Sequence, residues 1–281
     1  MEPSVQHIRQ ATGDGQTVAA TLTGRGTPVL FLHGIPGSRV TWAQVTAHLG
    51  PDLLAIVPDL LGFGDSSEPT GDFHAFGQAE ALAQLMTALG HPAFHLVGFD
   101  FGGPTAIALT GRHASRVRSL TLISTNAFPD TPIPGPLGLA RVPVVGDLMF
   151  AAMCSLPGLA GMWAGAVGDK RALPAGRFIA ELPDRRGRRW TRRIFLDSLR
   201  HLHDRYTPID GLLSGITCPT LVVWGDADPF FPLDVGQRTA RAIPAARLEV
   251  LRGCGHFAPG ERPQALAALV RTHVSSALAM S

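Results

Sequence analysis

Residues 98–103 read Gly-Phe-Asp-Phe-Gly-Gly and are the most informative stretch of this sequence. The apolar run before them, residues 93–97, follows a proline and is typical of a short buried strand. The run after them, residues 104–110, begins with a proline, which the first turn of a helix tolerates. The stretch therefore predicts a strand, a sharp turn and a helix, with the side chain of Asp100 presented at the turn.

Asp100 admits two interpretations. The flanking glycines allow a tight bend, and a carboxylate beside backbone N–H groups and a helix N-terminus is expected to stay ionised and able to attack as a nucleophile. Alternatively, Asp100 only caps a helix in a glycine-rich turn, because short glycine motifs have many false positives. The rest of the chain helps to choose between the two.

The loop that follows the predicted strand at residues 27–32 supports the first interpretation. This loop reads His-Gly-Ile-Pro-Gly, and the N–H of Ile35, together with the N–H of Phe101, would form an oxyanion hole. Three neighbours of Ile35 are expected to shape the loop: His33, Gly34 and Pro36. An imidazole beside a Gly-x-Pro turn can hold backbone groups, so we expect His33 to orient the loop and not to act as a base.

Two downstream loops carry the other polar groups. A predicted strand at residues 220–225 ends in an acidic loop that contains Asp226 and Asp228. A second strand, residues 248–251, is followed by a loop that contains His256. The carboxyl ends of parallel strands meet at one edge of a sheet, where ligands bind in such folds. We therefore expect an acid and a histidine near Asp100.

The chain resembles the α/β-hydrolase family over nearly its whole length. Five ordered motifs carry the resemblance: His33-Gly34-x-Pro36, Pro58-Asp59-x-x-Gly62-x-Gly64-Asp65-Ser66, Gly98-x-Asp100-x-Gly102-Gly103, Gly225-x-x-Asp228-x-x-x-Pro232 and Gly255-His256. Nucleophile, acid and histidine also follow the chain order of that family. The resemblance favours Asp228 as the acid and leaves Asp226 to cap its turn. Aspartate at position 100 resembles the epoxide hydrolase and haloalkane dehalogenase branch, since serine esterases of this fold carry serine there.

The resemblance implies a two-step hydrolysis. Asp100 would attack an electrophilic carbon and form an alkyl-enzyme ester. His256, oriented by Asp228, would then deprotonate the water that attacks the ester carbonyl. The N–H groups of Ile35 and Phe101 would hold the oxyanion formed in that step.

The leaving group separates the two activities of this branch. Related dehalogenases cradle the halide with a tryptophan after the nucleophile and often an asparagine before the proline, whereas this chain has Phe101 and Ile35. Related epoxide hydrolases mostly use two cap tyrosines, and Tyr206 is the only tyrosine here, so His201 or His203 would complete a donor pair. We favour epoxide hydrolysis of a small to medium apolar substrate and keep haloalkane dehalogenation as the alternative.

Two further classes of function stay open. One is a non-hydrolytic lyase or cyclase on the same fold, because a fold does not fix a function. The other is a ligand-binding or interaction protein that uses the arginine-rich run at residues 185–193 and whose catalytic site has lost its activity. The presence of both His256 and Asp228 argues against such a loss. Six arginines around a tryptophan suit an acidic partner or a nucleic acid. Lys170 is the chain's only lysine, so arginine is its usual cation, and we interpret the run as a solvated helix face.

The order of predicted elements indicates an α/β fold with a mostly parallel, doubly wound sheet. Strands are expected at residues 5–10, 17–23, 29–32, 53–57, 93–97, 120–123, 220–225 and 248–251, and helices at 42–49, 79–89 and 105–114. After the proline-rich turn near residue 130 no strand signal returns until residue 220. We therefore divide the chain into a first core part (1–129), an inserted helical cap (130–213) and a second core part (214–281).

Residues 148–168 contain no charged side chain and are long enough to suggest a membrane span. Pro157 and several glycines make the run a poor single helix, so we expect two short apolar helices that line a pocket and no membrane span. Trp163 and Trp190 are expected to edge that pocket.

Composition agrees with a compact enzyme that acts on a small molecule. The chain has 281 residues, of which 45% are hydrophobic and 16% charged, and a net charge of +2, so a nucleic-acid partner is not expected. Its three cysteines are scattered and the N-terminus does not resemble a signal peptide, which favours the cytoplasm. No histidine has the spacing of a metal ligand, so we expect no metal and no cofactor, and a monomer or homodimer.

Overall fold

The computed structural model describes residues 5–13, 15–181, 188–244 and 246–280. Within them, strands form one sheet in the order β1-β2-β4-β3-β5-β6-β7-β8. Their bounds are β1 (Val5–Ala11), β2 (Thr17–Gly24), β3 (Thr27–Leu32), β4 (Leu53–Pro58), β5 (Phe94–Phe99), β6 (Val117–Ile123), β7 (Thr220–Gly225) and β8 (Ala246–Leu251). β2 pairs antiparallel with β1 and β4, and the pairs from β4 onward to β8 are parallel. The predicted α/β fold with a mostly parallel sheet is confirmed.

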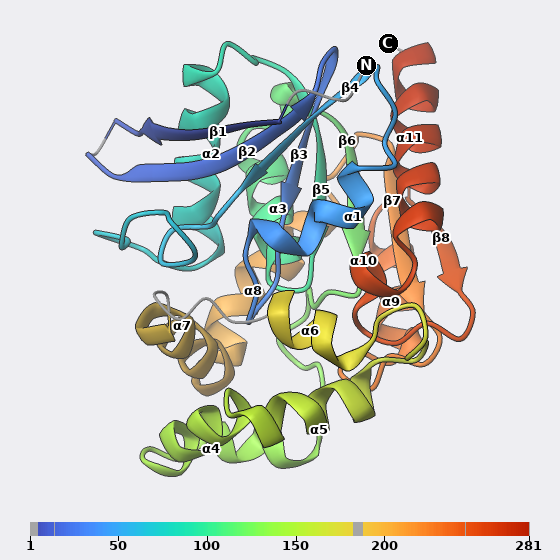
Figure 1. The fold of residues 1–281 in the computed structure, drawn as a ribbon. Helices are drawn as coiled ribbons and strands as arrows, with labels where there is room; N and C mark the ends of the chain where they lie inside the picture. The colour runs from blue at the N-terminus through green and yellow to red at the C-terminus, as the bar shows by residue number, and fades with distance from the viewer. Residues whose placement is uncertain (1–4, 14, 182–187, 245, 281) are drawn as a thin grey trace.

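Helices cover both faces of the sheet (Figure 1). The core helices are α1 (Ala43–Thr46), α2 (Ala75–Ala88), α3 (Gly102–Arg112), α9 (Leu233–Ala242), α10 (Ala258–Glu261) and α11 (Pro263–Ala279), with 3₁₀ turns η1 (Arg39–Trp42) and η2 (Ala114–Arg116). Side chains alternate along each strand, so Leu30 and Leu32 pack with α2 and α3 while Val29 and Phe31 pack with α1 and α11. This burial on both faces explains the continuous apolar runs in the sequence.

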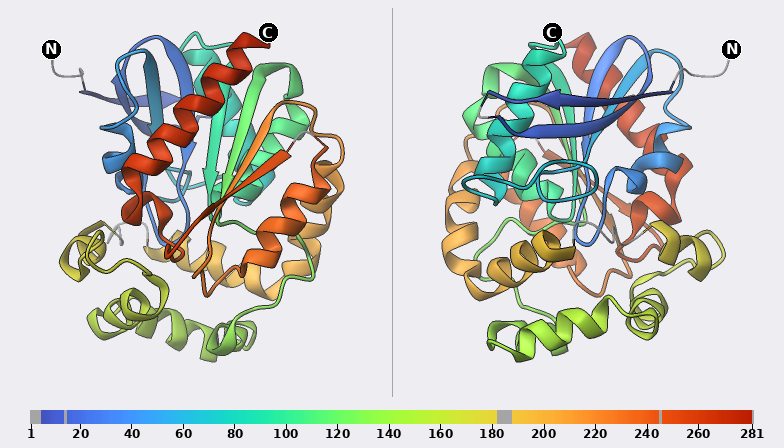
Figure 2. Two further views of the ribbon diagram at one scale, coloured as in Figure 1. Left: turned by 90° about the vertical axis from the view of Figure 1, so that its right-hand side faces the viewer. Right: turned by 60° about the vertical axis from the view of Figure 1, so that its left-hand side comes forward.

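The chain from β6 to β7 is helical. We call residues 130–213 the cap segment. It contains η3 (Gly135–Arg141), α4 (Val145–Met153), α5 (Leu156–Ala166), α6 (Ala175–Glu181), α7 (Arg188–Arg200) and α8 (Leu202–Leu213). In Figures 1 and 2, α4 and α5 lie beyond the carboxyl ends of the parallel strands. α8, the last helix of the cap segment, packs against α3 of the core, so the structure shows no clear separation between the cap segment and the core there. The domain limits at residues 130 and 213 therefore stay a prediction.

The apolar run at residues 148–168 folds as two short helices, as predicted. The first helix ends at Met153, and Ser155 caps the second, because its Oγ accepts the N–H of Gly158 at 3.2 Å and Pro157 occupies the first turn. α4 and α5 meet at an angle of 78°. Among the described residues no single helix is long and apolar enough to cross a bilayer, although α4 and α5 together have the length and composition.

Candidate active site

The turn between β5 and α3 holds Asp100 in a conformation that few L-residues adopt. Its φ is +51°, and the hydroxyl of Thr125 donates to its carbonyl oxygen at 2.6 Å. A Cβ on Gly98 would collide with the carbonyl of Gly102, and one on Gly102 would collide with the carbonyl of Leu32. The two glycines of the motif are therefore required for close backbone approach, and the turn presents the Asp100 side chain at the carboxyl end of the sheet.

The carboxylate of Asp100 lies between an N–H donor and an imidazole. The N–H of Ile35 donates to Oδ1 at 2.6 Å, and Nε2 of His256 lies 3.6 Å from Oδ2. Phe101, the next residue, is the N-cap of α3, so its N–H lies at the positive end of the helix dipole. The N–H of Ile35 thus contacts the Asp100 carboxylate, and the oxyanion hole of Ile35 and Phe101 stays a prediction.

His256 is held by the acid that the resemblance favours. Its Nδ1 lies 2.9 Å from Oδ2 of Asp228, whose Oδ1 accepts the N–H groups of Phe230 and Phe231 at 2.9 and 3.0 Å. Asp226 points elsewhere and accepts the N–H of Gly253 at 2.7 Å. Asp100, His256 and Asp228 therefore form one chain of contacts, and Asp226 joins two loops.

The two carboxylates hold a proton on His256. Burial of the ring opposes its charged form, but the charges of Asp228 and Asp100, and its contacts with them, outweigh burial and raise the pKa of His256 to about 10. With Asp100 ionised, His256 is consequently an imidazolium at neutral pH.

The loop at residues 33–37 is held by His33, as expected. Its Nδ1 lies 2.9 Å from the carbonyl oxygen of Gly34, and its Nε2 accepts the N–H of Leu60 at 3.1 Å. Burial lowers the pKa of His33, which keeps the ring neutral and suits one donor and one acceptor nitrogen. Gly34 packs so closely that a Cβ there would collide with Asp100. The loop is thereby fixed with the Ile35 N–H on Asp100.

A cavity of about 410 Å³ opens above Asp100 and His256. Its wall is mainly apolar and includes Ile35, Pro36, Pro132, Ile133, Pro134, Leu137, Met153, Met162, Phe195, Leu199, Leu202, Phe230, Phe231 and Phe257. Tyr206 of α8 reaches the same cavity. Burial and then the charge of Asp100 raise the pKa of Tyr206, so the phenol keeps its proton.

The structure corrects four of the predicted pocket residues, none of which lines the cavity. His201 and His203 are exposed to solvent. Trp163 is partly buried and packs against the core, and its Nε1 donates to the carbonyl of Leu173 at 2.8 Å. Trp190 packs against Phe73, with ring centroids 5.6 Å apart. Each side chain points away because the direction of a helical side chain depends on how its helix is rotated against the core.

Sequence reasoning missed three polar residues of the cavity, Asn126, Thr131 and Ser198. The hydroxyl of Thr131 donates to Oδ1 of Asn126 at 2.6 Å, and Asn126 also bonds to the backbone of Phe128. Asn126 follows the carboxyl end of β6, and that position is the signal that would have found it. Ser198 of α7 also lines the cavity.

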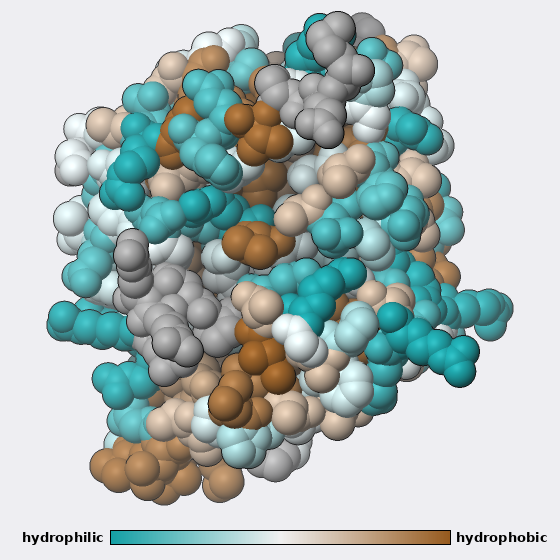
Figure 3. All heavy atoms as spheres, in the orientation of Figure 1, coloured by the Kyte–Doolittle hydropathy of each residue, from teal (hydrophilic) through white to brown (hydrophobic). Residues whose placement is uncertain are grey.

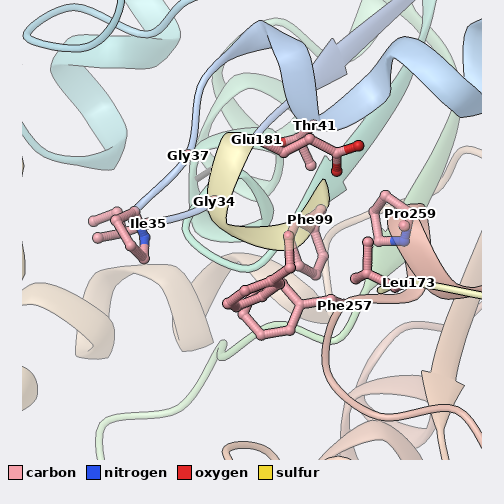
Figure 4. A pocket seen from close by; sticks show the side chains of 12 residues that line it. Gly34, Ile35, Gly37, Thr41, Phe99, Leu173, Glu181, Phe257 and Pro259 are labelled. Carbon is pink, nitrogen blue, oxygen red and sulfur yellow. The ribbon is translucent and has the colours of Figure 1, made fainter. Parts of the chain in front are cut away.

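A smaller pocket lies behind the loop at residues 33–37 (Figure 4). Ile35 and Phe257 line both this pocket and the main cavity and so separate them. The volume is about 20 Å³, which is room for about one water molecule.

Possible metal ligands, the cysteines and the arginine-rich run are the features of the sequence that remain to be placed. Among the described residues no group of three or more His, Cys, Asp or Glu side chains is placed to hold a metal ion. The three cysteines are free, and burial raises the pKa of Cys254, so that thiol stays protonated. Of the arginine-rich run, Arg189, Arg192 and Arg193 are exposed on α7, whereas residues 185–187 lie outside the described part.

The chain belongs to the alpha/beta hydrolase fold family, which it matches over residues 27–182 and 161–263. A 2-hydroxy-6-oxononadienedioate/2-hydroxy-6-oxononatrienedioate hydrolase from Burkholderia vietnamiensis is 31% identical, over 86% of this chain and 85% of the relative. The structure of a thermophilic esterase from Thermogutta terrifontis superposes with a TM-score of 0.80 at 26% sequence identity, and the match covers 97% of this chain and 99% of the esterase chain. The structure of epoxide hydrolase CorEH superposes with a TM-score of 0.79 at 17% sequence identity, and the match covers 97% of this chain and 99% of the CorEH chain. At that identity the likeness to CorEH shows the shared fold alone. The protein is thus an α/β hydrolase.

Proposed function

We propose that this hydrolase opens epoxides, with Asp100 as the nucleophile and Tyr206 as the proton donor. The observation that carries the proposal is a carboxylate at the strained turn, within one cavity that also contains His256 and a tyrosine hydroxyl. A carboxylate needs no base to attack, whereas an epoxide oxygen needs a proton as its C–O bond breaks. The cavity has a group for each need.

In the first step, Asp100 attacks a ring carbon of the epoxide and forms an ester. Oδ1 already accepts the N–H of Ile35, so Oδ2, on the side of His256, is the oxygen that is free to attack. The C–O bond of the ring breaks, and Tyr206 donates its proton to the leaving alkoxide. The ester carries no charge, because Asp100 has given an electron pair to the new C–O bond.

Loss of that charge prepares the second step. Asp100 is one of the two carboxylates that hold the proton on His256, so forming the ester lowers the pKa of that histidine. The proton leaves for the Tyr206 phenolate or for solvent, and neutral His256 takes a proton from water. The resulting hydroxide attacks the ester carbonyl, whose oxyanion receives the N–H groups of Ile35 and Phe101. Collapse breaks the ester C–O bond, and the leaving alkoxide takes the proton of the carboxylic acid formed at Asp100, which releases the diol and restores the Asp100 carboxylate.

The cavity wall favours a neutral, apolar substrate. No lysine or arginine is among its described lining residues, and the cation it has, His256, already lies between two carboxylates. The name of the Burkholderia vietnamiensis relative describes a dicarboxylate substrate. A dicarboxylate would lose its hydration here without gaining a counter-charge, which is costly. An epoxide on a small to medium hydrocarbon has no such cost.

The same wall disfavours haloalkanes. A leaving halide needs N–H donors, yet the ring of Phe101 is buried 6.3 Å from that of Phe63 and does not line the cavity. The side-chain amide of Asn126 is on the wall, but one of its two N–H groups already donates to the carbonyl of Phe128 at 3.0 Å, which leaves a single N–H for a halide. Tyr206, on the same wall, offers an O–H that suits a leaving oxygen.

The test is to assay styrene oxide, 1-bromohexane and 4-nitrophenyl butyrate side by side, and to trap the intermediate with His256→Gln. We expect turnover of the epoxide, and a His256→Gln protein that gains the mass of one substrate on the peptide containing Asp100. Asp226→Asn is the matched control and should turn over without accumulating an adduct. Binding of the epoxide without an adduct, with solvent oxygen in the product of the first turnover, would overturn the covalent step.

A further inference from the structure

The outer surface of the cap segment exposes a group of large apolar side chains. We call this surface the cap face; it consists of Leu139, Val142, Val144, Val145, Leu148 and Leu156, which are between 40% and 69% exposed. They are six of the eleven large hydrophobic residues that are exposed in the described part of the chain. Figure 3 shows hydrophobic residues gathered at the lower end of the molecule, over α4. The cap face is therefore a concentrated patch, of a kind that marks an interaction site.

The chain around the cap face is apolar enough to enter hydrocarbon. Asp147 is the only charged residue between positions 142 and 168, and Ser155 the only hydroxyl. α4 and α5 together have the length and composition of a membrane-spanning segment, but their 78° bend spreads them over the cap. The segment thus offers almost no hydrogen-bonding side chains, and this composition suits the hydrocarbon of a bilayer.

Arginines border the cap face. Arg141 donates to the carbonyl of Leu199 at 3.3 Å, and Arg200 donates to the carbonyl of Ala140 at 3.2 Å. Arg192 lies 3.7 Å from Asp147 of α4. Arg141 and Arg192 are exposed, whereas Arg200 is half-buried. The border thus presents two exposed cations beside one acid, and apolar residues with such a rim match the surface of a bilayer that contains anionic phospholipid.

The cap face and the cavity share their walls. Met153, Gly158 and Met162 of α4 and α5 line the cavity, while Leu148 and Leu156 of the same helices face outward. One layer of helix therefore separates the cavity from whatever covers the cap face. We propose that the cap face docks on bilayers containing anionic phospholipid, with α4 and α5 in the interface, and that apolar substrates enter from the lipid. Docking does not depend on the chemistry at Asp100.

The test is co-sedimentation of the full chain with vesicles of phosphatidylcholine and phosphatidylglycerol, and with vesicles of phosphatidylcholine alone. We expect binding to the mixed vesicles that weakens as salt is raised, because the arginines contribute. The paired substitution Leu148→Glu and Leu156→Glu should reduce binding about tenfold or more, since it puts charge into the interface. Leu278→Glu on α11 is the control: it adds a charge at another exposed leucine and should bind like the wild type.

Thermal melting checks that each variant folds, and we expect that each does, because the substituted leucines are exposed. The proposal fails if the wild type sediments with neither vesicle, or if Leu278→Glu weakens binding as much as the paired substitution. It also fails if the paired substitution turns a dimer into a monomer and leaves vesicle binding unchanged. That result would show that a second copy of the chain covers the cap face.

Discussion

At Asp100 a single residue combines an unusual backbone conformation with the only carboxylate on the cavity wall that the structure describes. Asp100→Asn keeps the shape of the side chain and removes the nucleophile. We expect kcat/KM for styrene oxide to fall by about four orders of magnitude or more, as when other nucleophiles are removed. Activity within several-fold of wild type, in protein shown to be folded by its melting curve, would contradict the assignment.

The choice between the two aspartates of the β7 loop can be tested at the same scale. Asp228→Asn should lower kcat about 10⁴-fold, because an amide no longer fixes the orientation and charge of His256. Asp226→Asn should change kcat less than about tenfold, since its remaining oxygen can still accept the N–H of Gly253. The opposite order in steady-state assays would mean that Asp226 orients the histidine.

The raised pKa of His256 predicts a dependence of stability on pH. A group whose pKa is raised on folding adds stability that is complete below its unfolded pKa and is lost as pH rises through its folded pKa. For His256 this window runs from 6.5 to about 10. The Tm of the wild type should therefore exceed that of His256→Gln most at pH about 6, and the difference should shrink toward pH about 10. A difference that stays constant in scanning calorimetry across this range would show that His256 is not held as a cation.

At the scale of elements, the sequence predicts strands better than cap helices. β4 and β7 lie within one residue of the expected ranges because their apolar runs are bounded by glycine, proline or acidic residues. The expected helix at residues 42–49 is instead the 3₁₀ turn η1 followed by the short α1, since tertiary packing of Trp42 overrides local preference. In the cap, Tyr206 reaches the cavity and His203 does not, although they are three residues apart. That difference depends on the rotation of α8, which periodicity alone does not determine.

One contact between elements connects the cap segment to the histidine loop. Oε2 of the buried Glu261 accepts the N–H groups of Gly168, Asp169 and Gly255, at 2.9, 2.8 and 3.0 Å. Glu261→Ala should lower the free energy of unfolding by about 1–3 kcal/mol, because it leaves these donors without their acceptor. Glu261→Gln should cost less, and Glu249→Ala, at a half-exposed site with one surface ion pair to Arg247, should cost less than about 1 kcal/mol. Urea denaturation measures the free energy of unfolding of all three variants. Equal values for the three would show that Glu261 does not stabilise the contact between the cap segment and the histidine loop.

For the molecule as a whole, the cavity lies between the sheet and the cap segment, so a ligand that fills it contacts both. The five motifs predicted the part on the sheet, Asp100, His256 and Asp228, because each follows a strand end. The cavity residues on the cap segment depend on how its helices pack, and no sequence motif predicts that packing. The motifs therefore indicate the reacting groups, and the polarity of the substrate is inferred from the cavity wall.

The last prediction tests that wall through the stability of the whole fold. A ligand that binds only the folded state raises its stability, by about 2.7 kcal/mol at a concentration 100 times its Kd. Hexanamide is neutral and apolar apart from one amide that Tyr206 can contact, whereas adipate has a carboxylate at each end. We expect hexanamide to raise the Tm in proportion to the logarithm of its concentration, and adipate to leave it unchanged, because the described wall has no lysine or arginine. Replacing the cavity residue Met162 by lysine should reverse the preference, since it supplies a counter-charge. Stabilisation of the unaltered protein by adipate alone would instead indicate a dicarboxylate substrate, as in the Burkholderia vietnamiensis relative.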